Sequence, residues 1–219
     1  HFMFSSMLQD LRHAVGGLET KFITPHLPVV PEVDPATYNL DVRAYLLLSH
    51  AALEQFVEDL CLELVNRATD SWESNHHLSE PILALIAFYS DGLTISDNER
   101  DPEVTFFDHI RLGLEKAKAT YSAYLKKKNN GVSVKYLRQM LLPVGMSVPT
   151  DPKWVGSLGQ LASYRGDNAH KHRVTKVTDP ERAREWVQDC LQMASQLADD
   201  AAKAMFRPCF REDSRTWII

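Results

Sequence analysis

The feature that most constrains the fold is a run of apolar residues at steps of three and four between residues 35 and 71. Side chains at this spacing lie on one face of an α-helix, so the run predicts a helix with a broad buried face. No segment shows a convincing alternation of apolar and polar residues, the pattern that predicts a half-buried strand. The sequence therefore predicts an all-α protein whose longest core helix covers about Pro35–Ser71. The apolar residues of the run are Leu46, Leu53, Phe56, Val57, Leu60, Leu64 and Val65.

Proline, glycine and capping residues divide the rest of the chain into further helices, giving about six or seven in all. The prolines at positions 25, 28, 31 and 35 predict an extended arm before the core helix, and Asp91–Asp101 reads as a polar loop. The other predicted helices are Ser6–Phe22, one opened by Ser79 and Pro81, Val104–Leu125, one capped by Ser133 and ended by Gly145, Lys153–His170, and a last one opened by Thr178-Asp179-Pro180.

These elements predict three parts along the chain. Residues 1–36 form an N-terminal helix and the proline-rich arm, residues 37–206 a helical domain, and residues 207–219 a tail. The tail has no periodicity and ends in the apolar run Trp217-Ile218-Ile219, which predicts a mobile segment or an interface.

Several classes of protein are excluded by composition. The three cysteines are too few and too scattered for a disulfide framework or a zinc site, and they indicate a reducing, cytoplasmic setting. No apolar run approaches the ~20 residues of a membrane span. The histidines at positions 50, 76, 77 and 172 are not spaced with carboxylates or cysteines as metal ligands, so they are interpreted as surface or satisfied polar residues. No metal or cofactor site is predicted.

The formal net charge of −5 hides a strong asymmetry. Residues 1–115 carry 6 Lys and Arg against 19 Asp and Glu, a balance of −13, whereas residues 116–219 carry 18 against 10, a balance of +8. Either the acidic half serves solubility and attracts the basic half, or the basic half presents a phosphate-facing surface. The overall acidity argues against a general nucleic-acid coat protein and favours selective or transient contact.

A candidate catalytic motif, Arg165-Gly166-Asp167-Asn168-Ala169-His170, lies in the basic half. Cleavage of RNA through the 2′-hydroxyl needs a group that moves a proton near neutral pH, which histidine supplies, and a cation that stabilises charge on the phosphate, which arginine supplies. The alternative for such a pair is a solvated helix face. The candidate RNA-binding residues that follow the motif are Lys171, Arg173 and Lys176.

With this motif placed before a long C-terminal helix, the chain resembles the HEPN superfamily, whose signature is an arginine, four to six residues, then histidine. The resemblance is closest to the RiboL-PSP group and extends over roughly residues 40–205. Three blocks carry it: Tyr45–Glu58 (YLLLSHAALEQFVE), Asn129-Asn130-Gly131 leading to Leu141–Met146 (LLPVGM), and Tyr164–His170 (YRGDNAH).

The resemblance implies an HEPN-like helical bundle that pairs with a second copy, so that two Arg/His motifs face one cleft. It also implies a metal-independent endoribonuclease of toxin or phage-defence type, acting on RNA and regulated by an antitoxin or another defence-system protein. Arg165 and His170 match the two signature positions. Family members often have a polar residue after the arginine, and Gly166 departs from that pattern, although Asp167 and Asn168 supply polar groups nearby.

On an ideal helix, five residues turn ~500° and rise ~7.5 Å, so Arg165 and His170 point about 140° apart. Either Gly166 loosens the turn, or a two-fold dimer completes the site with residues of both copies. Glu54 either orients Arg165 through a charge-assisted pair or is a helix-surface glutamate. Asn168 either bonds to His170 or phosphate, or caps a turn.

Three functions remain open from the sequence. The first is a homodimeric ribonuclease in which His170 transfers the proton and Arg165 stabilises the phosphorane. The second is a non-catalytic HEPN module that binds RNA, a nucleotide or a protein partner. The third is a helical scaffold whose motif only bonds across a dimer, and in that case removing Arg165 should disrupt folding or pairing.

Overall fold

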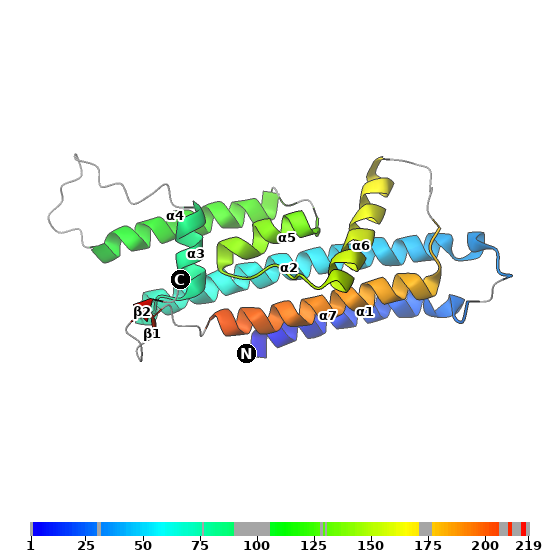
Figure 1. The fold of residues 1–219 in the computed structure, drawn as a ribbon, viewed down its shortest axis with the longest axis horizontal. Helices are drawn as coiled ribbons and strands as arrows, with labels where there is room; N and C mark the ends of the chain where they lie inside the picture. Colours follow the sequence, from blue (N-terminus) through cyan, green and yellow to red (C-terminus); the bar gives the residue numbers. More distant parts are fainter. Residues whose placement is uncertain are drawn as a thin grey trace. The chain divides into compact units, whose positions relative to one another are not determined.

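A computed structural model of the protein describes residues 2–29, 32–75, 77–89, 106–127, 129, 131–170, 177–205, 210–211 and 216–217. Side chains are described at all of these positions except 2, 106, 107, 167–170 and the four residues from 210 onward. Seven α-helices contain most of the described residues, which confirms the predicted all-α fold (Figure 1). They are α1 (Phe2–Phe22), α2 (Asn39–Asn75), α3 (Glu80–Tyr89), α4 (Phe106–Lys127), α5 (Val134–Leu141), α6 (Pro152–His170) and α7 (Pro180–Ala204).

The segment before α2 differs from the predicted extended arm. It contains two short 3₁₀ helices, Thr24–His26 and Pro35–Thr37, each with a proline near its start. Asp34 caps the second by accepting a hydrogen bond from the backbone amide of Ala36 at 2.9 Å. Because this turn occupies residues 35–37, α2 begins at Asn39 rather than at Pro35, and it continues to Asn75, beyond the predicted end at Ser71.

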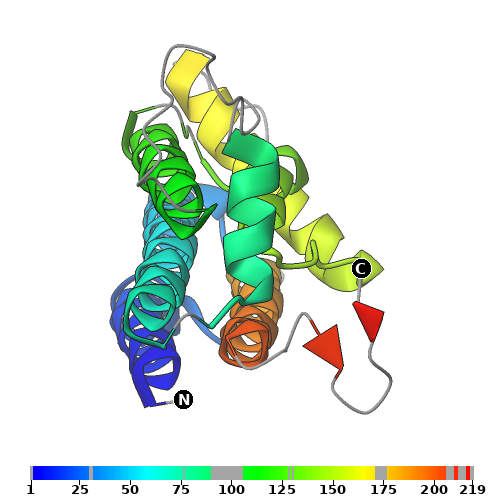
Figure 2. The same ribbon diagram turned by 90° about the vertical axis from the view of Figure 1, so that its left-hand side faces the viewer.

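The chain forms two compact units. The first comprises residues 1–60, 130–137 and 148–199, and its buried residues come mainly from α1, the first part of α2, α6 and α7. Figures 1 and 2 show α1 and α7 lying along one another. Polar contacts show that the two helices are antiparallel: Arg12 bonds to Ser195 at 3.4 Å, while Glu19 pairs with Arg184 at 3.2 Å and accepts from Gln188 at 3.1 Å.

The second unit comprises residues 61–129, 138–147 and 200–219. Here α3 packs against α4 and against a 3₁₀ helix at Leu142–Val144. The hydroxyl of Tyr121 on α4 donates to the carbonyl of Met140 at 2.5 Å. Gly145 follows the 3₁₀ helix with a φ of 71°, and a β-carbon there would stand 2.9 Å from Cγ of Glu80. The glycine thus ends this 3₁₀ helix, whereas α5 itself ends at Leu141.

The tail differs from the strand-free prediction in one place. Phe210–Arg211 and Thr216–Trp217 pair as a two-stranded antiparallel ladder, β1 and β2, with Phe210 opposite Trp217. The rest of the tail, including Ile218 and Ile219, lies outside the described residues, as does the predicted polar loop Asp91–Asp101. The three-part domain organisation stays a prediction.

The described residues meet neither the requirements of a membrane-spanning helix nor those of a metal site. None of them combines the length and the apolar character that crossing a membrane requires. Within the described residues, histidine, cysteine and carboxylate side chains nowhere gather in threes as a metal site would need.

Candidate functional site

Helix α6 carries the Arg/His motif, and its first turn is capped by Asp151. The carboxylate accepts hydrogen bonds from the backbone amides of Lys153 at 2.8 Å and Trp154 at 3.3 Å, which satisfies two amides that a helix start leaves without partners. The helix then continues without a break through Gly166 to His170. Gly166 therefore does not interrupt the helix, and Arg165 and His170 keep a helical phase difference of about 140°.

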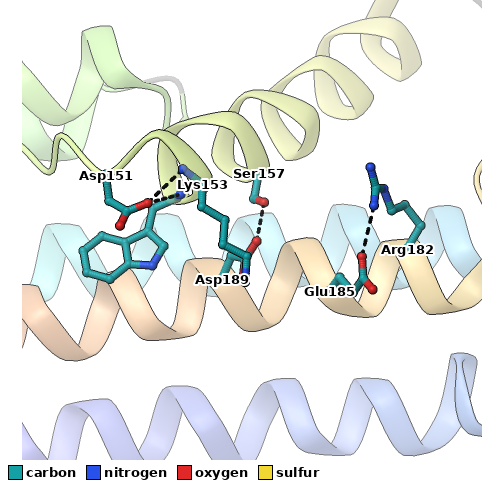
Figure 3. Close-up of polar contacts among 7 residues, drawn as sticks. Asp151, Lys153, Ser157, Arg182, Glu185 and Asp189 are labelled. Carbon is teal, nitrogen blue, oxygen red and sulfur yellow. Dashed lines mark hydrogen bonds and ion pairs between the residues drawn. The ribbon is translucent and has the colours of Figure 1, made fainter.

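A polar cluster fixes the first half of α6 to α7, as Figure 3 shows. Asp189 on α7 is buried, and its Oδ2 accepts a hydrogen bond from the hydroxyl of Ser157 at 2.7 Å. Nζ of Lys153 lies 2.8 Å from the other carboxylate oxygen. A buried carboxylate needs such donors because burial removes its water. The cluster thus anchors α6 at one position along α7.

Two contacts anchor α6 directly before Arg165. Tyr164 is buried, its hydroxyl forms a hydrogen bond with the hydroxyl of Thr178, and its ring lies 6.2 Å from the ring of Trp186 on α7. Tyr164 is therefore held by both a polar and an aromatic contact. These contacts fix the backbone position from which the side chain of the next residue, Arg165, extends.

Arg165 meets Glu54 on α2. Its Nη1 lies 3.6 Å from Oε2 of Glu54, and the two side chains are 40% and 17% exposed. Of the two alternatives for Glu54, the structure thus supports the pair with Arg165 over a helix-surface glutamate. A half-exposed guanidinium oriented by a carboxylate keeps surface that a phosphate can reach.

Gly131 lies directly against Arg165. A β-carbon at this position would stand 2.1 Å from Nη1 of Arg165, closer than atoms can approach, and 3.3 Å from Cζ. The backbone angle φ of Gly131 is 137°, a value that residues other than glycine rarely adopt. The guanidinium therefore packs on bare backbone at this point.

His50 completes the surroundings of Arg165, and it is one turn before Glu54 on α2. The ring is 2% exposed, and its Nε2 lies 3.2 Å from the carbonyl oxygen and 3.4 Å from the amide nitrogen of Val132. Its Nδ1 lies 3.9 Å from Oε2 of Glu54, the same oxygen that faces Arg165. His50 is thus a satisfied polar residue, as predicted, but it sits at the candidate site.

Burial sets the ionisation of both side chains on α2. It lowers the pKa of His50 from 6.5 to about 4, against the hydrogen bond with Val132, and the positive charge of Arg165 lowers it further. Burial raises the pKa of Glu54, the charge of Arg165 opposes this rise, and Glu58 adds to it. Near neutral pH the His50 ring is therefore uncharged, while Arg165 is the permanent cation of the group.

The structure brings together the three sequence blocks that carry the family resemblance. His50 and Glu54 come from the first, Gly131 from the second and Arg165 from the third. His50 and Gly131 were not predicted as site residues, although the order and spacing of the blocks contain the signal. The catalytic role of Arg165 and the supporting role of Glu54 stay predictions.

The remaining predicted site residues are placed less fully. The backbone of Asp167, Asn168 and His170 belongs to α6, but their side chains lie outside the described residues. Their predicted catalytic and supporting roles stay predictions. The candidate RNA-binding residues Lys171, Arg173 and Lys176 also lie outside the described residues, so the RNA path stays a prediction.

A comparison with protein families identifies the class of this protein. The model of the RiboL-PSP-HEPN family matches residues 21–203. Because the match extends over most of the chain, the protein belongs to this family, which confirms the resemblance seen in the sequence. HEPN families are generally associated with ribonuclease activity, and membership indicates a module of predicted ribonuclease or nucleotide-binding type. Neither the curated proteins nor the solved structures contain a match to the chain.

Proposed function

We propose that this protein is a metal-independent endoribonuclease of toxin or phage-defence type that acts as a homodimer in the cytoplasm. The proposal depends on how the Arg165 guanidinium is held and how far it is exposed. Its guanidinium is oriented by Glu54 and by the backbone of Gly131, yet 40% of the side chain stays exposed. A positioned cation that solvent can reach is what stabilisation of a phosphate transition state requires.

The proposed reaction needs only the two motif side chains. His170, as general base, takes the proton of the 2′-hydroxyl while that oxygen attacks phosphorus, and Arg165 stabilises the added negative charge. The bond from phosphorus to the 5′-oxygen then breaks, and the leaving oxygen takes a proton from a histidinium. The products are a 2′,3′-cyclic phosphate and a 5′-hydroxyl.

A second copy of the chain solves the problem of helical phase. Since α6 is continuous, positions 165 and 170 of one chain lie about 140° apart around the helix axis, so we expect residues from two copies to serve one phosphate better. Next to the site, α2 exposes Leu48 and Ala51, and no charged residue stands between Arg43 and Glu54. Two exposed uncharged side chains one turn apart fit pairing with the same surface of a second chain.

The dimer is tested by light scattering, which should report about twice 24.9 kDa at micromolar concentration. Leu48→Glu should shift the protein toward a monomer and reduce cleavage. Leu112→Glu, at an exposed leucine on α4, is the matched control and should change neither. A strict monomer in the wild type, with or without RNA, contradicts the composite site.

The chemistry is tested with Arg165→Ala and His170→Ala, each of which should abolish cleavage of labelled RNA while helix content and pairing persist. General acid–base assistance contributes about 10²–10⁴-fold, so loss of His170 should fall in that range. Arg165→Lys should also be impaired, because an ammonium lacks the two-pronged contact with phosphate. Wild-type cleavage should persist in EDTA and leave a cyclic phosphate. Activity that survives both alanine changes, or that EDTA alone removes, refutes the mechanism.

A non-catalytic module is the second candidate, and one observation favours it. Gly166 follows Arg165 where family members often carry a polar side chain. Among the described residues, leaving aside its chain neighbours and the backbone of its own helix, no atom lies within 4 Å of a β-carbon built at Gly166. In that case the same surface binds RNA, a nucleotide, or a protein such as an antitoxin or another defence-system component. The purified wild type would then bind RNA or such a partner without cleaving any of a varied set of RNAs.

A further inference from the structure

His50 is a buried side chain that takes no part in the proposed reaction. The ring lies between two groups that contact Arg165: the carboxylate of Glu54 at one nitrogen and the backbone of Val132 at the other. Val132 is itself buried and directly follows Gly131, the residue whose backbone lies against the guanidinium. His50 thus lies against both groups that surround Arg165, the Glu54 carboxylate and the Gly131–Val132 backbone.

The distances show how the ring is held. Nε2 lies within hydrogen-bond reach of the Val132 backbone, 3.2 Å from the carbonyl oxygen and 3.4 Å from the amide nitrogen, so it can donate to the first or accept from the second according to its tautomer. Nδ1 lies 3.9 Å from Oε2 of Glu54, which is too far for a hydrogen bond. Oε2 therefore stays available to Nη1 of Arg165.

We propose that His50 is a positioning residue for Arg165, because it holds the Gly131–Val132 backbone against the guanidinium while leaving the Glu54 carboxylate to pair with it. This inference rests on the proposed ribonuclease function and deepens it. A neutral ring suits the role, since a charged side chain at position 50 would compete with Arg165 for the same carboxylate oxygen.

The variants for the test follow from the geometry. His50→Gln places an amide N–H near the position of Nε2 and should preserve the bond to Val132, whereas His50→Leu fills similar space without a donor. Two controls on the same buried face of α2 are Ser49→Ala and Leu53→Ala. Neither side chain belongs to the Arg165 site, and the second change should destabilise the helix packing by making a cavity.

We expect kcat for RNA cleavage to fall about 10- to 100-fold in His50→Leu, the scale expected when a catalytic group is displaced by about 1 Å. KM should stay unchanged, because the proposed RNA contacts along the chain are intact. His50→Gln should restore kcat, and both controls should keep it even though Leu53→Ala is less stable. Wild-type kcat in His50→Leu overturns the inference, as does an equal loss of kcat in Leu53→Ala, which would indicate a merely structural role.

A second measurement separates this inference from the proposed function. In the protein without RNA, the NMR signal of the Arg165 side-chain Nε–Hε group should match between wild type and His50→Gln, and should move toward the position of a free arginine in His50→Leu. An unmoved signal in His50→Leu overturns the positioning role. If the wild type cleaves no RNA while this signal moves as expected, the ribonuclease function fails and the positioning of Arg165 by His50 stands.

Discussion

Stability should depend on pH through His50, in a direction that the burial of its ring determines. The imidazole takes up a proton near pH 6.5 in the unfolded chain but only near about 4 in the folded one. Between these values the unfolded chain binds more protons, so the free energy of unfolding must decrease as the pH falls. The stabilising contribution is fully present above pH 6.5 and is lost on approaching pH 4.

The size of this effect follows from the two pKa values. Each pH unit between them corresponds to 1.36 kcal/mol, so the fall from 6.5 to about 4 amounts to about 3 kcal/mol. The ring is almost completely buried, and solvent does not screen this cost as it would at the surface. A loss of this order is a large fraction of the stability of a typical domain.

The assay is urea unfolding between pH 4 and 7.5, with wild type compared with His50→Gln. Glutamine does not titrate, so the variant should lose about 3 kcal/mol less than the wild type across this interval. Subtracting the two curves removes the contributions of other groups, including Glu54, whose raised pKa acts with the opposite sign. Parallel curves for the two proteins would refute the reasoning, because His50 would then take up its proton equally well folded and unfolded.

Three further predictions test the site and its anchors. Gly131→Ala should strongly reduce RNA cleavage in a kinetic assay, because the new β-carbon would stand 2.1 Å from Arg165 Nη1, and backbone strain should lower the free energy of unfolding by about 1–3 kcal/mol. Ser157→Ala should lower that free energy by about 1–3 kcal/mol in urea, since the buried carboxylate of Asp189 loses a donor; an unchanged midpoint would contradict this. Salt should weaken RNA binding, and glutamine at the three basic positions after the motif should flatten the slope of log affinity against log salt. An unchanged slope places the RNA path elsewhere. These positions are Lys171, Arg173 and Lys176.

Most of the fold was predictable because helical periodicity and capping residues are local signals. Asp179 with Pro180 opens α7, and Ser133 precedes α5, as the sequence predicts. The two 3₁₀ helices before α2 were not predicted, because prolines at this density favour an extended chain as readily as short turns. The short strands β1 and β2 were missed for a different reason. Two residues are too few to show an alternating pattern.

The candidate site was only half visible in the sequence. Arg165 was predicted by the chemistry of its side chain and by the motif, and Glu54 entered as one of two alternatives. His50 and Gly131 act through contacts with residues 82 and 34 positions away along the chain, and no local pattern reports such contacts. A buried histidine and a glycine at positive φ become informative only when the backbone around them is known.

The buried carboxylate on α7 has a consequence for the accuracy of the site. Apolar helix faces tolerate sliding by one turn, since one leucine can replace another in the same groove. Asp189 prevents such sliding of α6. Lys153 and Ser157 are one turn apart on α6, and both must face the same carboxylate at once. A slip of one turn would move α6 by about 5.4 Å, enough to take Arg165 out of reach of Glu54. The cluster therefore fixes the register of α6 along α7. A change at Ser157 can misplace Arg165, which lies about two turns further along the same helix.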